Sequence, residues 1–154
     1  MNPKLHLSLW LLLLPLLTFS QYAKQHVSGK KEIKWGAVKK EIPAEGFEKR
    51  FLYFEGAMYD GAHNNLPVYT YKVATENNAS QIKAVIINPV FVAFENSELE
   101  KIEGLNSIGT EIEVNAAVGY NQKKKVSVVS FIPIRKNAST GQYEKLVRDR
   151  KSTR

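Results

Sequence analysis

Apolar and polar residues alternate along several short stretches of this chain, a pattern that indicates half-buried β-strands. The clearest case is 110–135, where one alternating stretch, 110–120, is followed by a polar turn at 121–124 and a second alternating stretch, 125–135. We predict a β-hairpin there. The first stretch places these apolar side chains on one face: Ile112, Val114, Ala116 and Val118.

Four further stretches alternate in the same way or are rich in β-prone residues. These predicted strands are 32–35, 51–54, 67–74 and 142–147. A longer apolar run, 81–94, is interrupted by Asn88-Pro89, and a proline cannot donate a hydrogen bond to a strand ladder. We therefore predict two short strands or one broken edge strand in that run.

The segments between the predicted strands are charged or rich in turn-forming residues. Loops or turns are predicted at 36–50, 56–65, 76–80 and 136–141. One short helix is predicted at 97–104, because Ser97 and Glu100 have the spacing of a capping box and Gly104 would end the helix.

Beyond position 20, no long stretch keeps the period of an amphipathic helix. Short strands separated by Gly, Asn and Pro turns are typical of sandwiches and barrels. The sequence therefore predicts an all-β fold, a single β-sandwich or barrel-like domain of short antiparallel strands.

The first twenty residues have the features of a secretory signal peptide. A lone cation, Lys4, precedes an apolar run at 7–19, which is shorter than the roughly 20 residues of a membrane-spanning helix. We expect cleavage before Gln21, with an uncleaved anchor as the alternative. The predicted division is a signal peptide at 1–20, a leader or linker at 21–30, the β-domain at 31–147 and a polar tail at 148–154.

The formal net charge is +7, and much of the excess lies in Lys123-Lys124-Lys125 and in 145–154. The lysine triplet lies between two predicted strands, where a solvated turn is the ordinary explanation. Because neither a helix nor an aromatic platform organises this charge, no nucleic-acid partner is expected.

Few residues have the spacing of a catalytic or metal site. The chain has no cysteine, so a disulfide, a lipoprotein linkage and a thiol nucleophile are excluded within it. His63 lies near Asp60 in a predicted loop, but no second His is at ligand spacing. Four carboxylates without the pattern of a calcium loop are interpreted as a solvated face: Glu95, Glu98, Glu100 and Glu103. We predict no cofactor and no metal.

Two further features have alternative interpretations. Seven aromatic residues are predicted to lie in the core, with an exposed carbohydrate platform as the alternative. They are Trp35, Phe51, Tyr53, Phe54, Tyr59, Tyr69 and Tyr71. Glycosylation sequons occur at Asn78-Ala79-Ser80 and Asn137-Ala138-Ser139, both in predicted turns.

Several short motifs occur in a characteristic order. Phe-x-Gly-Ala-x-Tyr at 54–59 is followed by Leu-Pro-Val-Tyr at 66–69, then by 129–135 and 141–146. Their order and spacing resemble the N-terminal domain of gingipain-type cysteine peptidases, most closely that of the type IX secretion system sortase. The resemblance implies structural roles for Phe54, Gly56, Ala57, Tyr59, Leu66, Pro67, Pro133, Arg135, Tyr143 and Leu146.

The resemblance implies an exported protein of the periplasm, outer membrane or cell surface of a Bacteroidetes-type bacterium. In gingipains the corresponding region is a propeptide that assists folding and restrains the active site. The implied partner is a caspase-like peptidase domain, with other outer-membrane components of type IX secretion as further partners. The sortase itself removes C-terminal sorting domains from cargo and attaches the cargo to surface lipopolysaccharide.

The chain departs from this family pattern at its C-terminal end. After Val147 it continues as a polar segment, and the family's catalytic His and Cys lie beyond that point. The resemblance therefore predicts a truncated or split, non-catalytic N-terminal domain. The alternative is a stand-alone periplasmic or surface β-sandwich that binds glycan or protein, which would require an exposed aromatic patch or apolar face.

Overall fold

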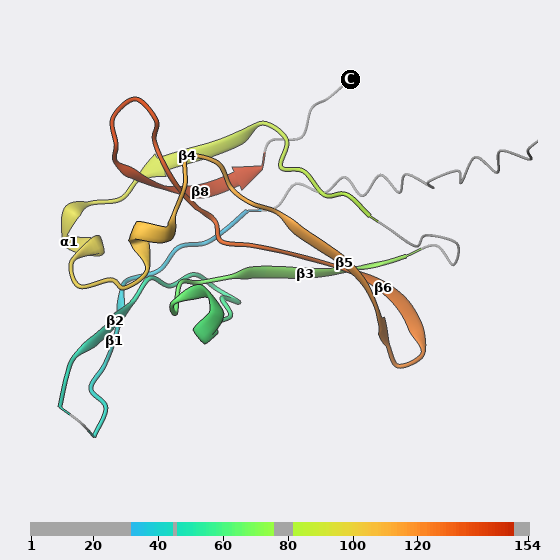
Figure 1. Cartoon of the computed structure of the whole chain (residues 1–154), viewed down its shortest axis with the longest axis horizontal. Coiled ribbons are helices and arrows are strands. Elements are labelled where there is room, and N and C mark those ends of the chain that lie inside the picture. The colour runs from blue at the N-terminus through green and yellow to red at the C-terminus, as the bar shows by residue number, and fades with distance from the viewer. Residues whose placement is uncertain (1–31, 45, 76–81, 150–154) are drawn as a thin grey trace, which may run out of the picture.

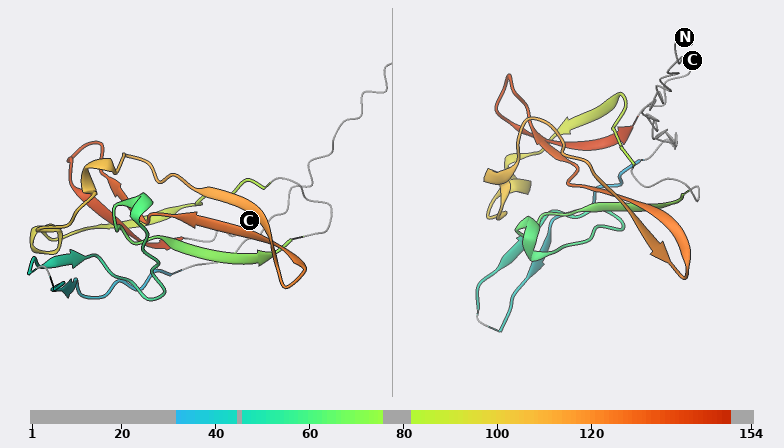
Figure 2. Two further views of the ribbon diagram at one scale, coloured as in Figure 1. Left: turned by 60° about the horizontal axis from the view of Figure 1, so that its bottom comes forward. Right: turned by 45° about the vertical axis from the view of Figure 1, so that its right-hand side comes forward.

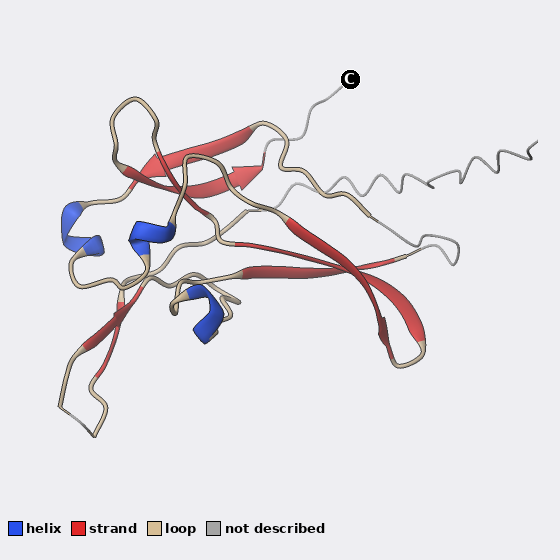
Figure 3. Cartoon of the chain, viewed as in Figure 1, coloured by secondary structure: helices blue, strands red, loops and turns tan. Residues whose placement is uncertain are grey.

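The computed structural model describes residues 32–44, 46–75 and 82–149. Its regular secondary structure consists mainly of short β-strands (Figure 3). The strands are β1 (Lys39–Glu41), β2 (Lys49–Phe51), β3 (Tyr69–Ala74), β4 (Pro89–Ala93), β5 (Asn115–Asn121), β6 (Lys124–Phe131), β7 (Ile134–Lys136) and β8 (Tyr143–Asp149). The helical elements are α1 (Asn96–Leu99), η1 (Gly61–His63) and η2 (Leu105–Ser107). The predicted signal peptide, leader and 76–80 turn lie outside the described residues, as does the Asn78 sequon.

Two three-stranded antiparallel sheets form the body of the domain, in the orders β3-β6-β5 and β4-β8-β7 (Figure 1). The chain passes from one sheet to the other between β6 and β7, through Ile132 and Pro133. Side chains from both sheets meet in one core cluster, to which β6 contributes Val129 and Phe131 and β8 contributes Leu146. The predicted all-β, sandwich-like fold is confirmed.

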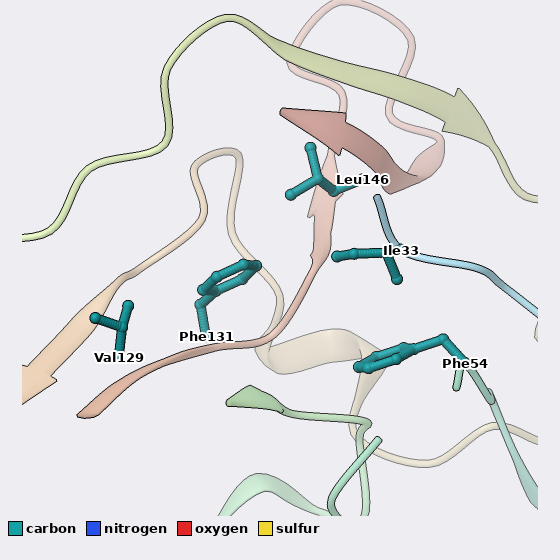
Figure 4. Close-up of a cluster of buried hydrophobic side chains, with 5 residues drawn as sticks. All are labelled: Ile33, Phe54, Val129, Phe131 and Leu146. Carbon is teal, nitrogen blue, oxygen red and sulfur yellow. The ribbon is translucent and has the colours of Figure 1, made fainter. Parts of the chain in front are cut away.

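The core consists of two neighbouring clusters. The first contains Ile33, Phe54, Val129, Phe131 and Leu146 (Figure 4), and the second contains Leu52, Leu66, Phe94, Leu105 and Ile134. Trp35 contacts both, with its ring edge-on to Phe54 and to Phe94 at centroid distances of 5.2 and 5.3 Å. Its indole Nε1 donates a hydrogen bond to the Leu146 carbonyl over 2.8 Å. This bond fixes the N-terminal segment against β8.

The predicted hairpin is confirmed up to Phe131, with β5 paired to β6 along its whole length. The end of its predicted second strand, 134–135, instead belongs to β7 of the other sheet. The turn residues of the hairpin, Gln122 and Lys123, have φ values of 47° and 66°, as a two-residue turn between tightly twisted strands requires. The paired part of the first strand begins at Asn115 rather than Thr110. Three of the four residues predicted to share a face are less exposed than both neighbours in sequence: Ile112, Val114 and Ala116. The fourth, Val118, is partly buried, as is Gly119 after it.

The predicted loop at 36–50 is wrong, because this segment contains β1 and part of β2, which form an antiparallel hairpin. All three residues of β1 are exposed, so neither face of that strand is buried and its sequence shows no alternation. The neighbouring strand predictions are right only in part. Phe51 ends β2, Phe54 makes an isolated bridge with Trp35, and Glu32 makes another with Arg148.

The helix prediction is shifted in the structure. α1 begins one residue before Ser97, and its capping box uses Glu95 and Glu98, whose carboxylate accepts from the Glu95 amide over 2.8 Å. Gly104 does not end this helix. It has a φ of 80° and precedes η2.

The long apolar run at 81–94 forms a strand only in its second half, β4. Exposure alternates along residues 82–87, but they belong to no sheet of the described residues. Asn88 has a φ of 50°, which bends the chain before β4 starts. β8 runs to Asp149, two residues beyond the predicted end of the last strand.

Candidate docking surface

Half of the motif residues lie inside the domain. Phe54 is fully buried in the first cluster, and the side chains of four others are almost completely inaccessible: Leu66, Pro67, Pro133 and Leu146. Pro133 also accepts a hydrogen bond at its carbonyl from the Leu146 amide, over 2.9 Å. These residues hold the two sheets together and present no chemistry to solvent.

Three further motif residues shape the turn after Phe54. Gly56 has a φ of 81°, a conformation that side chains with a Cβ rarely adopt. The Ala57 amide donates to the Phe54 carbonyl over 3.1 Å, and the Tyr59 hydroxyl donates to the Leu52 carbonyl over 2.8 Å. Partial burial is the main reason that the pKa of Tyr59 lies above its ordinary value. The motif therefore encodes a turn that is fastened to the core.

Arg135 belongs to a small polar network on the sheet β4-β8-β7. Its guanidinium lies 3.6 Å from the centre of the Phe91 ring, and both Nε and a terminal nitrogen lie 2.8 Å from the Glu144 carboxylate. The Asn137 amide donates to the same carboxylate over 2.7 Å. The Asn137 hydrogen bond and the Arg135 charge hold the pKa of Glu144 below its ordinary value despite its burial. Tyr143, half-buried, packs against the second cluster.

The carboxylates around α1 do not form one solvated face, which corrects the sequence interpretation. Glu98 pairs with Lys145 of β8 at 2.7 Å, and Glu100 pairs with Arg50 of β2 at 3.4 Å. Burial raises the pKa of Glu98, but hydrogen bonds from Lys145 and from the Glu95 amide outweigh it, so the net pKa is lowered. These pairs fasten α1 to two different sheets. Partners about fifty positions away cannot be read from the local sequence.

His63 and Asp60 act together as a local cap. The Asp60 carboxylate accepts from the His63 amide over 2.9 Å and lies 2.6 Å from the His63 Nδ1. The side-chain hydrogen bond with His63 is the main cause of the lowered pKa of Asp60. Within 32–44, 46–75 and 82–149, no three His, Cys, Asp or Glu side chains gather as metal ligands would.

Four of the seven aromatic residues belong to the core or pack against it: Trp35, Phe54, Tyr69 and Tyr71. Tyr69 lies 6.0 Å from Phe54 and 5.3 Å from Phe131, ring centre to ring centre. Trp35 completes this group through Phe54. Tyr59 is the most exposed of the seven, at 37 %, and its hydroxyl is bound to the backbone. The core interpretation is therefore confirmed for those four, whereas Phe51, Tyr53 and Tyr59 belong to neither core cluster.

The β1–β2 hairpin is the surface that sequence reasoning missed. It projects from the body of the domain (Figure 1), and its loop carries two large apolar side chains, Ile42 and Phe47, which are 75 % and 78 % exposed. Neither belongs to a core cluster. The signal in the sequence is two isolated apolar residues among charged neighbours. Apolar side chains that gather on an exposed surface mark contacts with other proteins, so we treat this tip as the candidate docking surface.

The base of this hairpin is held firmly although its tip is open to solvent. The Arg50 side chain is only 12 % exposed, and it donates to the Ser97 carbonyl over 2.9 Å as well as pairing with Glu100. On the other strand, the Lys39 ammonium lies 3.7 Å from the centre of the Tyr53 ring. A tip on a rigid base loses little conformational entropy when it binds.

Among the described residues, no helix is long and apolar enough to cross a membrane. No family model matches the chain, and no curated protein sequence matches it.

The chain is similar to a solved structure, the complex of Porphyromonas gingivalis RgpB pro- and mature domains. The likeness covers 77 % of this chain and 74 % of that chain, with a TM-score of 0.51 and 10 % sequence identity. The fold is gingipain-like. The resemblance predicted from the motifs is thus confirmed as a likeness of fold.

Proposed function

We propose that this chain is a propeptide-like, non-catalytic domain that packs on a caspase-like cysteine peptidase domain and assists its folding or restrains its activity. The observation that carries the proposal is the likeness of fold to a structure containing a pro-domain together with its mature domain. The chain has no cysteine, so it has no thiol nucleophile of its own. A docking role is consistent with both facts.

We assign the contact with the peptidase domain to the tip of the β1–β2 hairpin. Ile42 and Phe47 expose apolar surface that the core does not use, and burial of each side chain would contribute about 1.5–3 kcal/mol. The ordered base around Arg50 would hold the tip in place during binding.

The finer assignment is to the type IX secretion sortase and to an exported location, in the periplasm, outer membrane or cell surface. The sortase assignment rests on the order of the motifs from 54–59 to 141–146, and the export proposal rests on the predicted signal peptide at 1–20. Other outer-membrane components of type IX secretion are proposed as further partners on the same basis.

The alternative of a stand-alone binding module has its better support in its protein-binding form. Four of the seven aromatic residues that a glycan platform would need are engaged in the core, among them Trp35, Phe54 and Tyr69. The exposed hairpin tip fits a protein partner in either case. The identity of that partner separates the two functions.

The first test is to sequence the DNA 3′ of the Arg154 codon and to express any caspase-like peptidase domain encoded there. The full-length protein is then titrated into that domain, with binding followed by calorimetry and peptidase activity by hydrolysis of a peptide substrate. We expect binding that assists refolding or slows hydrolysis. A neighbouring peptidase domain that neither binds nor responds would overturn the proposal.

A matched pair of variants locates the contact. The double substitution Ile42→Asp and Phe47→Asp should weaken binding at least tenfold, as is usual for central apolar contacts. The control, Tyr120→Asp, changes a residue 76 % exposed near the tip of the β5–β6 hairpin and should leave the affinity unchanged. Equal effects of both changes would contradict the assignment to β1–β2.

A further inference from the structure

A second surface, far from the hairpin tip in sequence, is a groove of about 430 Å³ between two extended segments. One wall is 84–86, which leads into β4, and the other is 110–114, which leads into β5. Phe91 and Arg135 also line the groove. In Figures 1 and 2 these walls are the yellow-green and orange segments that approach β4 and β5. β4 and β5 are edge strands of the two sheets, so the groove lies between two sheet edges.

The backbone of both walls is unpaired among the described residues. Within the part of the chain that the structure describes, neither 82–88 nor 110–114 makes a backbone hydrogen bond. Exposure alternates along 82–87 and 111–114, and the less exposed side chains pack against the core: Ala84, Ile86, Ile112 and Val114. Rows of free amide and carbonyl groups along apolar, extended chain are what an added β-strand binds.

The charge of the groove is also unbalanced. Arg135 is neutralised by Glu144, as described above. Glu111 lines the groove, is exposed, and has no ion-pair partner among the described residues. The groove therefore carries a net negative charge at one wall, which favours a basic side chain in its ligand.

We propose that this groove binds an extended segment of another polypeptide as an added β-strand. The segment has apolar side chains at alternate positions and a Lys or Arg beside Glu111. Its backbone pairs with 82–88, 110–114 or both, and its apolar side chains pack over Phe91 and Ile112. A small polar ligand fits less well, because the groove offers rows of backbone groups rather than several convergent polar side chains. The proposal does not depend on the peptidase partner.

The test uses the full-length protein and a synthetic peptide, acetylated and amidated, of sequence Thr-Val-Arg-Val-Thr-Val. A second peptide replaces Arg by Glu. Binding is measured by NMR titration in 15N-labelled protein. We expect the Arg peptide to bind roughly two- to fivefold more tightly, the range of an exposed ion pair, and to shift amide resonances of 82–88 and 110–114. Failure of both peptides to bind, or shifts confined to other segments, would overturn the proposal.

Variants at exposed positions test the two contacts separately. Glu111→Lys should invert the preference between the peptides, whereas Glu55→Lys, an equal charge change at an exposed residue outside the groove, should not. Val85→Pro removes one wall amide at a residue 63 % exposed and should weaken both peptides roughly two- to tenfold. Unchanged circular dichroism would show that each variant folds. Equal affinities across all four proteins would contradict strand addition in this groove.

Discussion

Two phenylalanines show how differently the sandwich and the β1–β2 hairpin use apolar residues. Phe54 is completely buried between Trp35 and Tyr69, whereas Phe47 is 78 % exposed in the hairpin loop. The first contributes to the stability of the domain, and the second contributes almost nothing to it. An apolar residue that a fold does not need for itself is available for a partner.

The two regions are nevertheless joined. Arg50, at the base of the hairpin, reaches Ser97 and Glu100 beside α1, and α1 is held to β8 through Glu98 and Lys145. A partner that binds the tip would therefore act on an element connected to the core by polar contacts. The following changes test this contrast, from the largest expected effect on stability to the smallest.

Truncating the buried ring should have the largest effect. Phe54→Ala is expected to lower the free energy of unfolding by about 3–5 kcal/mol, because it leaves a cavity where both sheets meet. Phe47→Ala, the same change in the hairpin, should stay within about 0.5 kcal/mol. Urea unfolding followed by tryptophan fluorescence measures both. Similar losses of unfolding free energy in the two variants would contradict the distinction between the buried core and the exposed hairpin.

Two glycines with nearly the same backbone conformation provide the next comparison. An added Cβ at Gly104 would lie 2.6 Å from the Asn64 Cβ, whereas at Gly56 it would meet nothing within 4 Å. Gly104→Ala should therefore cost about 2–4 kcal/mol, through backbone strain plus crowding, and Gly56→Ala about 1 kcal/mol, through strain alone. Thermal and urea unfolding of the two variants would show the difference. A larger loss at Gly56 would contradict the packing around Gly104.

The ion pairs of the β4-β8-β7 sheet predict a dependence on acid. Glu98 and Glu144 have folded-state pKa values below their ordinary value of 4.5, so their contribution to stability is present above that pH and is lost as the pH falls further. Glu144→Gln should cost about 1–2 kcal/mol at neutral pH, because Arg135 loses its charged acceptor.

The same variant should also show a shallower loss of stability between neutral pH and pH 3 than the unmodified protein. Urea unfolding as a function of pH measures this slope. Glu111→Gln is the control, because Glu111 is exposed and unpaired among the described residues, and its pH profile should match that of the unmodified protein. Parallel profiles for all three proteins would contradict the role of the Arg135–Glu144 pair.

The smallest effect on stability is expected at the hairpin tip. The double substitution Ile42→Asp and Phe47→Asp should change the free energy of unfolding by less than about 0.5 kcal/mol, because both side chains already face solvent. Calorimetric unfolding measures it. A marked destabilisation would mean that the tip packs on the domain rather than facing a partner.

The sequence predicted the structural elements that depend on alternating hydrophobicity and on turn-forming residues. The β5–β6 hairpin was predictable because one face of each strand is buried and its short turn is polar. The last strand was predictable because a turn rich in Asn, Ser, Thr and Gly leads into the segment 142–147. The motif that includes Phe54 and Leu66 also led to the gingipain-like fold, since core residues and turn glycines constrain a fold strongly.

The sequence did not predict the features that depend on partners distant in sequence or on the solvent exposure of single side chains. β1 has no buried face, so its Lys-rich sequence had the appearance of a loop. The pairs Arg50–Glu100 and Glu98–Lys145 join residues about fifty positions apart. The exposure of Ile42 and Phe47 became clear only when the core was known to be complete without them. The candidate docking surface therefore could not be predicted from local sequence patterns.

The most direct test of the central claim is hydrogen exchange of the full-length protein with and without the proposed partner, a cysteine peptidase domain. If the hairpin tip is the docking surface, amides of 39–51 should exchange more slowly in the complex. Amides of β6 and β8, already protected in the sandwich, should change little. Unchanged exchange across 39–51 in a formed complex would contradict the claim that this hairpin contacts the peptidase domain.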